Sequence, residues 1–183
     1  PLNPVDVNGI NKVAGERYHL LYNQVHEIRS SVLRLTNTYG PRMRIKDARQ
    51  TFLGIWIRNL LEGKLIQVYG DGQQRRDYNY VDDLVDALII AATEKKAIGQ
   101  VYNLGAPDPM SLSKTAKIMC HGFEAASWNR IPFPKDRKAI DVGDFICDYS
   151  SFSSAFGWEP KIKFEDGIKR SLQYFRSELE HYI

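Results

Sequence analysis

The sequence lacks features that would indicate several other classes of protein. Its 183 residues include only two cysteines, Cys120 and Cys147, which match no metal-binding or disulfide spacing. No apolar run approaches the roughly 18 residues that a membrane-spanning helix needs, and no signal-peptide pattern is present. A net charge of +3 without a basic tail gives no indication of nucleic-acid binding. We therefore expect a cytoplasmic protein with reduced thiols and with no nucleic-acid, membrane or metal partner.

Two further absences concern the chain as a whole. No G-x-G-x-x-G dinucleotide fingerprint occurs anywhere in it. The chain opens without methionine on residues 1–4 (PLNP), a composition typical of the middle of a loop. These observations leave two alternatives, a small α/β fold or a fragment of a larger fold whose first half is absent.

What is present is ordinary for a globular protein and alternates in type along the chain. Hydrophobic residues make up 43% and charged residues 26%, enough for one large domain or one domain and part of a second. Periodicity predicts helices over 5–28, 52–61, 81–93, 111–120, 150–156 and 164–180. Short aliphatic runs predict strands over 31–35, 65–69 and 101–104, with a loop over 37–44 and irregular structure over 121–148. Strands that alternate with helices favour an α/β fold with a parallel sheet.

The most informative stretch is residues 69–83 (YGDGQQRRDYNYVDD). Its two glycines permit a tight turn and close approach of a ligand to the backbone. Arg75 and Arg76 then offer planar guanidinium groups suited to phosphate. Asp82 and Asp83 stand where we expect the N-cap of the following helix. This order suggests a site for a phosphorylated small molecule; the alternative is a surface hairpin with solvated charges.

Four segments together resemble a known family. Residues 33–41 (LRLTNTYGP) resemble the R-x-x-N-x-Y-G-P segment of nucleotide-sugar epimerases and dehydratases, in the extended short-chain dehydrogenase/reductase superfamily. Residues 69–83 resemble the family's Y-G-D-G-x-x-x-R-D-[FY]-x-[YH]-V-D-D, and residues 101–105 (VYNLG) its V-Y-N-[IL]-G. Residues 156–168, with G-W-E-P and a later G-I, resemble its C-terminal L-G-W-x-P…G-[IL].

The resemblance implies a fold and a division into lobes. It covers the second half of such an enzyme, so the expected fold is the second half of a Rossmann-type doubly wound parallel sheet with a smaller mixed α/β substrate-binding lobe. Residues 1–40 and 74–106 would belong to the dinucleotide-binding domain, and residues 41–73 and 107–183 to the nucleotide-sugar lobe. The cofactor implied is NAD, bound mainly by the N-terminal half that this chain lacks.

The catalytic signature of the family, Y-x-x-x-K, falls on the first predicted helix with one departure. Lys12 takes the lysine position, where the family's lysine lowers the pKa of the tyrosine and binds the nicotinamide ribose. Asn8 stands where the tyrosine is expected. The spacing keeps both on one helix face, but an amide cannot act as a general base. The alternatives are an inactive homologue, a base supplied from elsewhere and an introduced substitution; for Lys12 itself the alternative is a solvated lysine.

The resemblance also implies substrate-binding residues. Asn37 matches an asparagine that contacts the diphosphate, although an Asx-turn would also explain it. Arg76 matches the arginine that binds the diphosphate, which leaves Arg75 facing solvent. Val68 and Tyr69 match positions beside the nucleobase, with strand core as the alternative for Val68.

A later pair has a less regular match. Arg137 and Asp141 resemble an Arg…Asp pair that contacts phosphate and ribose. The spacing is one residue longer than in the familiar form, so Lys138 is a rival for the arginine role.

The expected function follows from these matches. The resemblance implies an NAD-dependent epimerase, with UDP-hexose 4-epimerisation by transient hydride transfer as the leading activity and a homodimer as the expected assembly. The alternatives are a nucleotide-sugar 4,6-dehydratase and a non-catalytic nucleotide-sugar-binding homologue, the latter because of Asn8.

Overall fold

The computed structural model describes residues 2–47, 51–121 and 126–183. Within them helices alternate with short strands, and the strand pairs β1–β6, β2–β5 and β3–β8 are parallel while β4–β7 is antiparallel. This arrangement confirms the α/β class. In chain order the elements are α1 (Val7–His26), β1 (Val32–Leu35), β2 (Asn37–Tyr39), α2 (Phe52–Leu61), β3 (Ile66–Tyr69), β4 (Arg75–Arg76), β5 (Tyr78–Tyr80), α3 (Val81–Thr93), η1 (Lys95–Ala97), β6 (Val101–Leu104), β7 (Met110–Ser111), α4 (Leu112–His121), β8 (Trp128–Ile131), α5 (Lys135–Lys138), α6 (Ser150–Phe156), α7 (Phe164–Glu178) and η2 (Leu179–His181).

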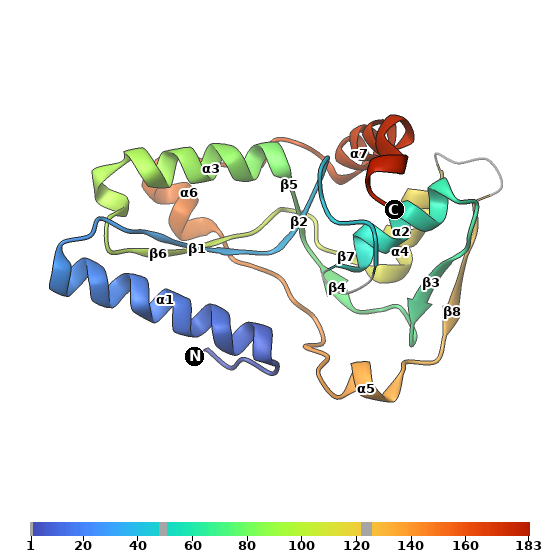
Figure 1. Cartoon of the computed structure of the whole chain (residues 1–183), viewed down its shortest axis with the longest axis horizontal. Helices are drawn as coiled ribbons and strands as arrows, with labels where there is room; N and C mark the ends of the chain where they lie inside the picture. The colour runs from blue at the N-terminus through green and yellow to red at the C-terminus, as the bar shows by residue number, and fades with distance from the viewer. Residues whose placement is uncertain (1, 48–50, 122–125) are drawn as a thin grey trace.

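Two regions lie side by side along the long axis (Figure 1). In one, β1 and β6 run between α1 on one side and α3 and α6 on the other. In the other, α2, α4 and α7 lie beside the β3–β8 pair. The strands β2, β4 and β5 lie where the two regions meet, so the residues of the 69–83 stretch occupy the junction.

Three of the helices, α1, α2 and α4, begin where a short polar side chain accepts a backbone N–H. Asp6 Oδ1 accepts a hydrogen bond from the N–H of Gly9 at 2.6 Å and starts α1. Thr51 caps α2 in the same way, and the hydroxyl of Ser111 accepts from Lys114 N at 3.2 Å in the first turn of α4. These contacts agree with the predicted starts of the three helices.

Two predictions about irregular segments are wrong. The expected loop over 37–44 contains β2, which pairs with β5. The expected irregular segment over 121–148 contains β8, which pairs with β3, and the short helix α5; its residues 122–125 lie outside the described part of the chain. Both strands depend on partners distant in sequence, which a local pattern does not reveal.

The N-cap expected at Asp82 and Asp83 is also wrong. The N-cap of α3 is Tyr80, and the two aspartates lie in the first helical turn, where negative charge is still favourable. The Asp83 carboxylate instead accepts a hydrogen bond from Ile162 N at 2.9 Å, and its carbonyl accepts from Trp158 Nε1 at 3.0 Å. Asp83 therefore fastens the C-terminal G-W-E-P segment onto α3.

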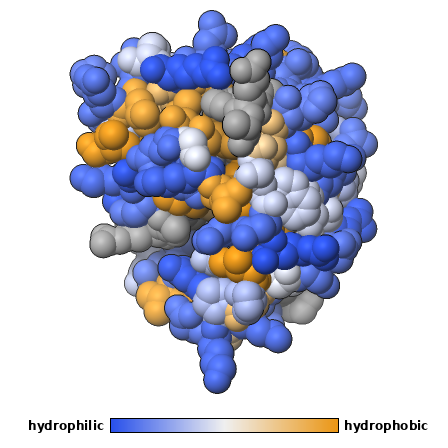
Figure 2. All heavy atoms as spheres, turned by 90° about the vertical axis from the view of Figure 1, so that its right-hand side faces the viewer, coloured by the Kyte–Doolittle hydropathy of each residue, from blue (hydrophilic) through white to orange (hydrophobic). Residues whose placement is uncertain are grey.

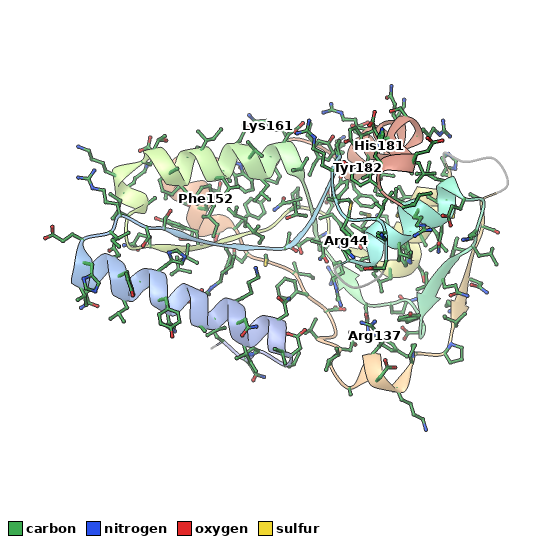
Figure 3. All side chains as sticks on the ribbon, in the orientation of Figure 1. Arg44, Arg137, Phe152, Lys161, His181 and Tyr182 are labelled. Atoms are coloured by element: carbon green, nitrogen blue, oxygen red, sulfur yellow. The ribbon has the colours of Figure 1, made fainter. Side chains whose placement is uncertain are left out.

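The buried residues form two separate clusters. The larger gathers side chains from α2, β3, β5, α4 and α7, including Tyr39 and Phe175. The smaller joins α3, β6 and α6 around Leu84, Leu104 and Phe152 (labelled in Figure 3). α6 thus packs with α3 and β6, although it follows β7 and α4 in the chain.

One bidentate ion pair holds α1 against β1. The two nitrogens Nε and Nη2 of Arg34 each donate to a carboxylate oxygen of Glu16 at 2.7 Å. The Glu16 side chain is 6% exposed and the Arg34 side chain 37%. The hydrogen bond from Arg34 lowers the pKa of Glu16, against the opposing effect of burial. Much of α1 otherwise presents exposed apolar side chains, among them Val7, Ile10 and Leu21.

We expect Glu16→Gln to lower the free energy of unfolding at pH 7 by about 1 kcal/mol, because it removes a charged hydrogen-bond pair whose carboxylate is buried and whose guanidinium is partly exposed. Since the folded state holds the pKa of Glu16 below its ordinary 4.5, this contribution is present above that pH and is lost as the pH falls through the folded-state pKa. Urea denaturation at pH 7 and below pH 4 measures the effect. The exposed Glu94, with no ion pair to the described residues, provides the control Glu94→Gln. A difference from the parent that stays constant with pH would contradict the prediction.

Candidate functional site

Asn8 and Lys12 lie one turn apart near the start of α1, and both are exposed. Lys12 forms no ion pair with any described residue, so its ammonium group is available to a ligand. Asn8 carries an amide, which can donate and accept hydrogen bonds but cannot exchange a proton near neutral pH. This end of α1 therefore offers a cation and an amide on one helix face, without a general base of its own.

Asn37 is the first residue of β2, and its side chain is already engaged. Its amide Nδ2 donates to the backbone carbonyl of Asp77 at 3.1 Å. Because this contact uses an Nδ2 hydrogen, the carbonyl oxygen Oδ1 of Asn37 remains as an acceptor. The contact fixes Asn37 against the turn that carries the two arginines.

Asp77, between β4 and β5, is completely buried. One carboxylate oxygen accepts from the Thr36 hydroxyl, and the other accepts from the backbone N–H groups of Ala106 at 3.1 Å and Cys147 at 3.2 Å. A buried carboxylate is tolerated only when it has such donors. Asp77 therefore joins the β1–β2 junction, the end of β6 and the segment before α6 at one point.

The Arg76 side chain, on β4, is 11% exposed and lies against residues 141–143. Its Nη1 donates to the carbonyl oxygens of Arg75, at 2.9 Å, and of Gly143. Its Nη2 lies 3.8 Å from Asp141 Oδ1, and Gln74 Nε2 donates to the other oxygen of Asp141 at 2.6 Å. Within the described residues Nε and Nη2 of Arg76 make no hydrogen bond, so this edge of the guanidinium keeps donors for an anion.

The two arginines of the 75–76 pair differ in surroundings. The side chain of Arg75 is exposed, and only its backbone is engaged: its N–H donates to Asp144 Oδ1 at 2.7 Å and its carbonyl accepts from Phe145 N at 3.0 Å. Arg76 is the arginine whose side chain is held among polar partners. The same strand thus presents one arginine to solvent and one to the 141–143 segment.

Arg137 and Asp141, expected to act together, have different neighbours. Asp141 lies beside Arg76, as described. The Arg137 side chain, on α5, is 52% exposed, and the carboxylate nearest to it is that of Asp136, at 3.9 Å (Figure 3). Lys138 is exposed on the same short helix, and its carbonyl accepts from Asp141 N at 3.3 Å. Among the described residues neither Arg137 nor Lys138 forms an ion pair with Asp141.

The two residues expected beside a nucleobase point in opposite directions. Val68 is fully buried in the larger cluster, so its side chain belongs to the strand core. Tyr69 is 38% exposed, and its ring centroid lies 5.5 Å from that of Phe133 at a tilt of 49°. The Tyr69–Phe133 pair forms an aromatic surface at the ends of β3 and β8.

Sequence reasoning missed several polar partners in this region. The sequence showed Asp77 only as the aspartate of the R-D motif. Its role as a buried acceptor could not be predicted, because its three donors come from segments that are distant in sequence. Gln74 and Phe133 lie in stretches that carry no periodic signal. Phe133 stands between Pro132 and Pro134, and the extended backbone that these prolines favour was the only indication of its position.

The other chemically reactive groups do not point to a second kind of site. Burial, and then the charge of Asp77, raises the pKa of the Cys147 thiol to about 11, so this thiol is protonated at neutral pH. The part of the chain that the structure describes contains no group of three His, Cys, Asp or Glu residues able to hold a metal ion. No helix in that part is both long and apolar enough to cross a membrane.

Comparison with known proteins gives consistent matches at the level of family. A dTDP-glucose 4,6-dehydratase from Actinoplanes sp. is 30% identical over 97% of this chain and 53% of its own length. A UDP-glucose 4-epimerase from Mycolicibacterium smegmatis is 28% identical over 97% of this chain and 55% of its own length. The chain therefore spans about half the length of these curated relatives.

Solved structures give matches of the same kind. A UDP-glucose 4-epimerase from Thermotoga maritima, solved with UDP-glucose, is 31% identical with a TM-score of 0.81, over 93% of this chain and 53% of that one. A UDP-glucuronic acid 4-epimerase from Bacillus cereus, in complex with UDP-glucuronic acid and NAD, is 27% identical with a TM-score of 0.80, over 96% of this chain and 54% of that one. The model of the NAD dependent epimerase/dehydratase family matches residues 1–105, more than half of the chain. The chain belongs to the NAD dependent epimerase/dehydratase family.

Proposed function

We propose that this chain supplies the lysine helix and the nucleotide-sugar pocket of an NAD-dependent enzyme that epimerises a UDP-hexose at C4. The observation that carries the proposal is the partly buried Arg76, held by Gly143 and by the ion pair of its Nη2 with Asp141, while its Nε makes no hydrogen bond to the described residues. A guanidinium fixed in this way suits the paired oxygens of a diphosphate. Asn37, whose Nδ2 donates to the Asp77 carbonyl and to Thr36 Oγ1, would contribute its Oδ1 to the same ligand.

Further residues would complete the pocket around the nucleotide. The exposed Tyr69 ring, supported by Phe133, suits stacking with a nucleobase. Val68 would contribute only through its backbone, because its side chain is buried. The carboxylate of Asp141 would accept hydrogen bonds from the ribose hydroxyl groups. Arg137, exposed on the adjacent α5, would contact the phosphates when the nucleotide binds. In this proposal residues 41–73 and 107–183 form the nucleotide-sugar lobe, except that α6 packs against residues 74–106.

NAD fits the exposed end of α1. Lys12, an unpaired ammonium among the described residues, would donate hydrogen bonds to the nicotinamide ribose, and most other contacts would come from a dinucleotide-binding domain of which residues 1–40 and 74–106 form part. When bound, NAD accepts a hydride from the sugar and returns it. The residues of this chain orient the sugar nucleotide and keep a positive charge beside the ribose.

A second candidate function, non-catalytic binding of a nucleotide-sugar, is favoured by Asn8. An amide at the tyrosine position cannot take the proton of a sugar hydroxyl, whereas a diphosphate pocket does not need that step. A 4,6-dehydratase is a third candidate, since a dehydratase is as similar to the chain as the epimerases are.

Calorimetric titration of the chain with UDP-glucose and with NAD tests the proposed nucleotide-sugar pocket. Binding of UDP-glucose but not of NAD supports the pocket, and binding of neither ligand contradicts it.

We also propose a cytoplasmic homodimer for the intact protein. The two free cysteines support a reducing compartment, and the exposed apolar side chains of α1 support burial of that helix against a second copy.

Restoring the tyrosine should restore proton transfer. In the intact protein, we expect Asn8→Tyr to raise epimerase turnover by roughly 10²–10⁴-fold, the usual contribution of a general base. The conversion of UDP-glucose, followed by chromatography of the sugar nucleotides, measures it, with Asn8→Phe as the control that adds the ring without the phenol. Unchanged turnover in the tyrosine variant would show that another group acts as the base.

Removing the guanidinium of Arg76 should weaken sugar-nucleotide binding. We expect Arg76→Ala to raise the Kd for UDP-glucose by about 10- to 100-fold, because a charge-assisted hydrogen bond to phosphate is lost. The matched control is Arg75→Ala. It removes an exposed side chain, keeps the backbone contacts of residue 75 and should leave the Kd unchanged. Equal effects of the two substitutions would contradict the separate roles.

Neutralising Asp77 should disturb both stability and binding. We expect Asp77→Asn to lower Tm by about 5–10 °C, because an amide has one acceptor oxygen, so either the Thr36 hydroxyl or both buried N–H groups lose their acceptor. The Kd for UDP-glucose should rise as well, since the Asp77 side chain ties Thr36, the neighbour of Asn37, to Cys147, which follows the 141–143 segment. Asp144→Asn is the control, because the Asp144 carboxylate is exposed and accepts from Arg75 N alone. A Tm equal to that of this control would contradict the anchoring role.

A further inference from the structure

A large groove lies between α4 and α7, at the end of the molecule away from α1 (Figure 1). Its volume is about 1150 Å³. The floor is apolar and is made by Ile118 and Met119 of α4 and by Ile168 and Leu172 of α7. Figure 2 views this end of the molecule and shows apolar atoms between hydrophilic ones. None of these residues belongs to the nucleotide-sugar site described above.

Both walls of the groove carry lysine or arginine side chains. On α4, Lys114, Lys117 and His121 follow each other at intervals of three and four residues, which places them on one face of the helix. Lys169 and Arg176 have the same relation on α7. Lys114, Lys117 and Lys169 form no ion pair within the described ranges. Against these cations the lining includes one carboxylate, Glu165.

The distribution of charge selects among possible ligands. A lipid or another anionic amphiphile carries its charge at one end, whereas these cations stand on both walls, and Lys169 and Arg176 are about 10 Å apart along α7. The volume also exceeds the roughly 300–1,000 Å³ of ordinary small-molecule sites. An amphipathic helix with acidic residues along both flanks matches the apolar floor and the two basic walls together.

We propose that the α4–α7 groove binds an amphipathic helix of a partner protein, with apolar residues at i, i+3, i+4 and i+7 and glutamate or aspartate on both flanks. The apolar side chains rest on Ile118 and Leu172, while the flanking carboxylates pair with Lys117 on one wall and Lys169 on the other. This interaction is independent of the enzymatic activity proposed above. It would attach the protein to an acidic helical segment without covering Arg76 or Lys12.

The test uses the full chain and two designed peptides of about 16 residues, long enough to form helix. Both carry leucine at i, i+3, i+4 and i+7; one has glutamate and the other glutamine on the flanks. We expect fluorescence anisotropy to show that the glutamate peptide binds at least about tenfold more tightly, with an affinity that falls as salt rises. Equal affinities of the two peptides, or no binding by either, would overturn the proposal.

Charge-reversal substitutions test whether the peptide binds in the α4–α7 groove. Lys117→Glu and Lys169→Glu should each weaken binding of the glutamate peptide by about threefold to tenfold. Lys95→Glu is the matched control: Lys95 is exposed on η1, outside the groove, and should leave the affinity unchanged. Because all three lysines are exposed, circular dichroism should show an unaltered fold. Binding that survives both groove reversals, or that falls equally with Lys95→Glu, would place the peptide elsewhere, for example on the apolar face of α1, and would refute the proposal.

Discussion

The arrangement of the candidate pocket depends on the hydrogen bonds around the buried carboxylate of Asp77. Three segments that are far apart in sequence meet there, at Thr36, Ala106 and Cys147. Taking a charge out of water costs several kcal/mol, so these donors are required for the fold to tolerate it. The same contacts set the distance between Asn37 and the 141–143 segment that holds Arg76. The Asp77 carboxylate therefore contributes both to folding stability and to the geometry of the candidate pocket.

A second polar contact positions the other half of the site. The Glu16–Arg34 pair fixes α1 on β1 and so sets where Asn8 and Lys12 lie relative to the sheet. Arg34 lies in the same L-R-L-T-N segment as Asn37. One short stretch thus orients the lysine helix at one end and contacts the proposed sugar-nucleotide pocket at the other.

Local patterns were enough to predict the aliphatic strands and the helices other than the short α5. α2, α3 and α6 begin and end where apolar periodicity, Gly63 and Gly157 indicate. β2 and β8 were missed because each is short and depends on a partner strand distant in the sequence. At the site, the resemblance named Arg76 and Asp141 separately and did not predict the ion pair between them, nor did it predict the separation of Arg137 from Asp141. That separation arises because α5 turns the chain between them, and neither spacing nor composition encodes this turn.

The parallel pairing of the strands has a consequence for how the chain folds. Val32 pairs with Val101 and Ile66 with Trp128, so neither ladder can form until most of the chain between its strands is available. Closing such long loops costs entropy before any ladder hydrogen bond compensates for it, and folds with these contacts form slowly. The helices, by contrast, are stabilised by contacts within a few residues. We therefore expect an early state with formed helices and unpaired strands, in which the apolar side chains of α1 and β1 are the surfaces most prone to association between chains.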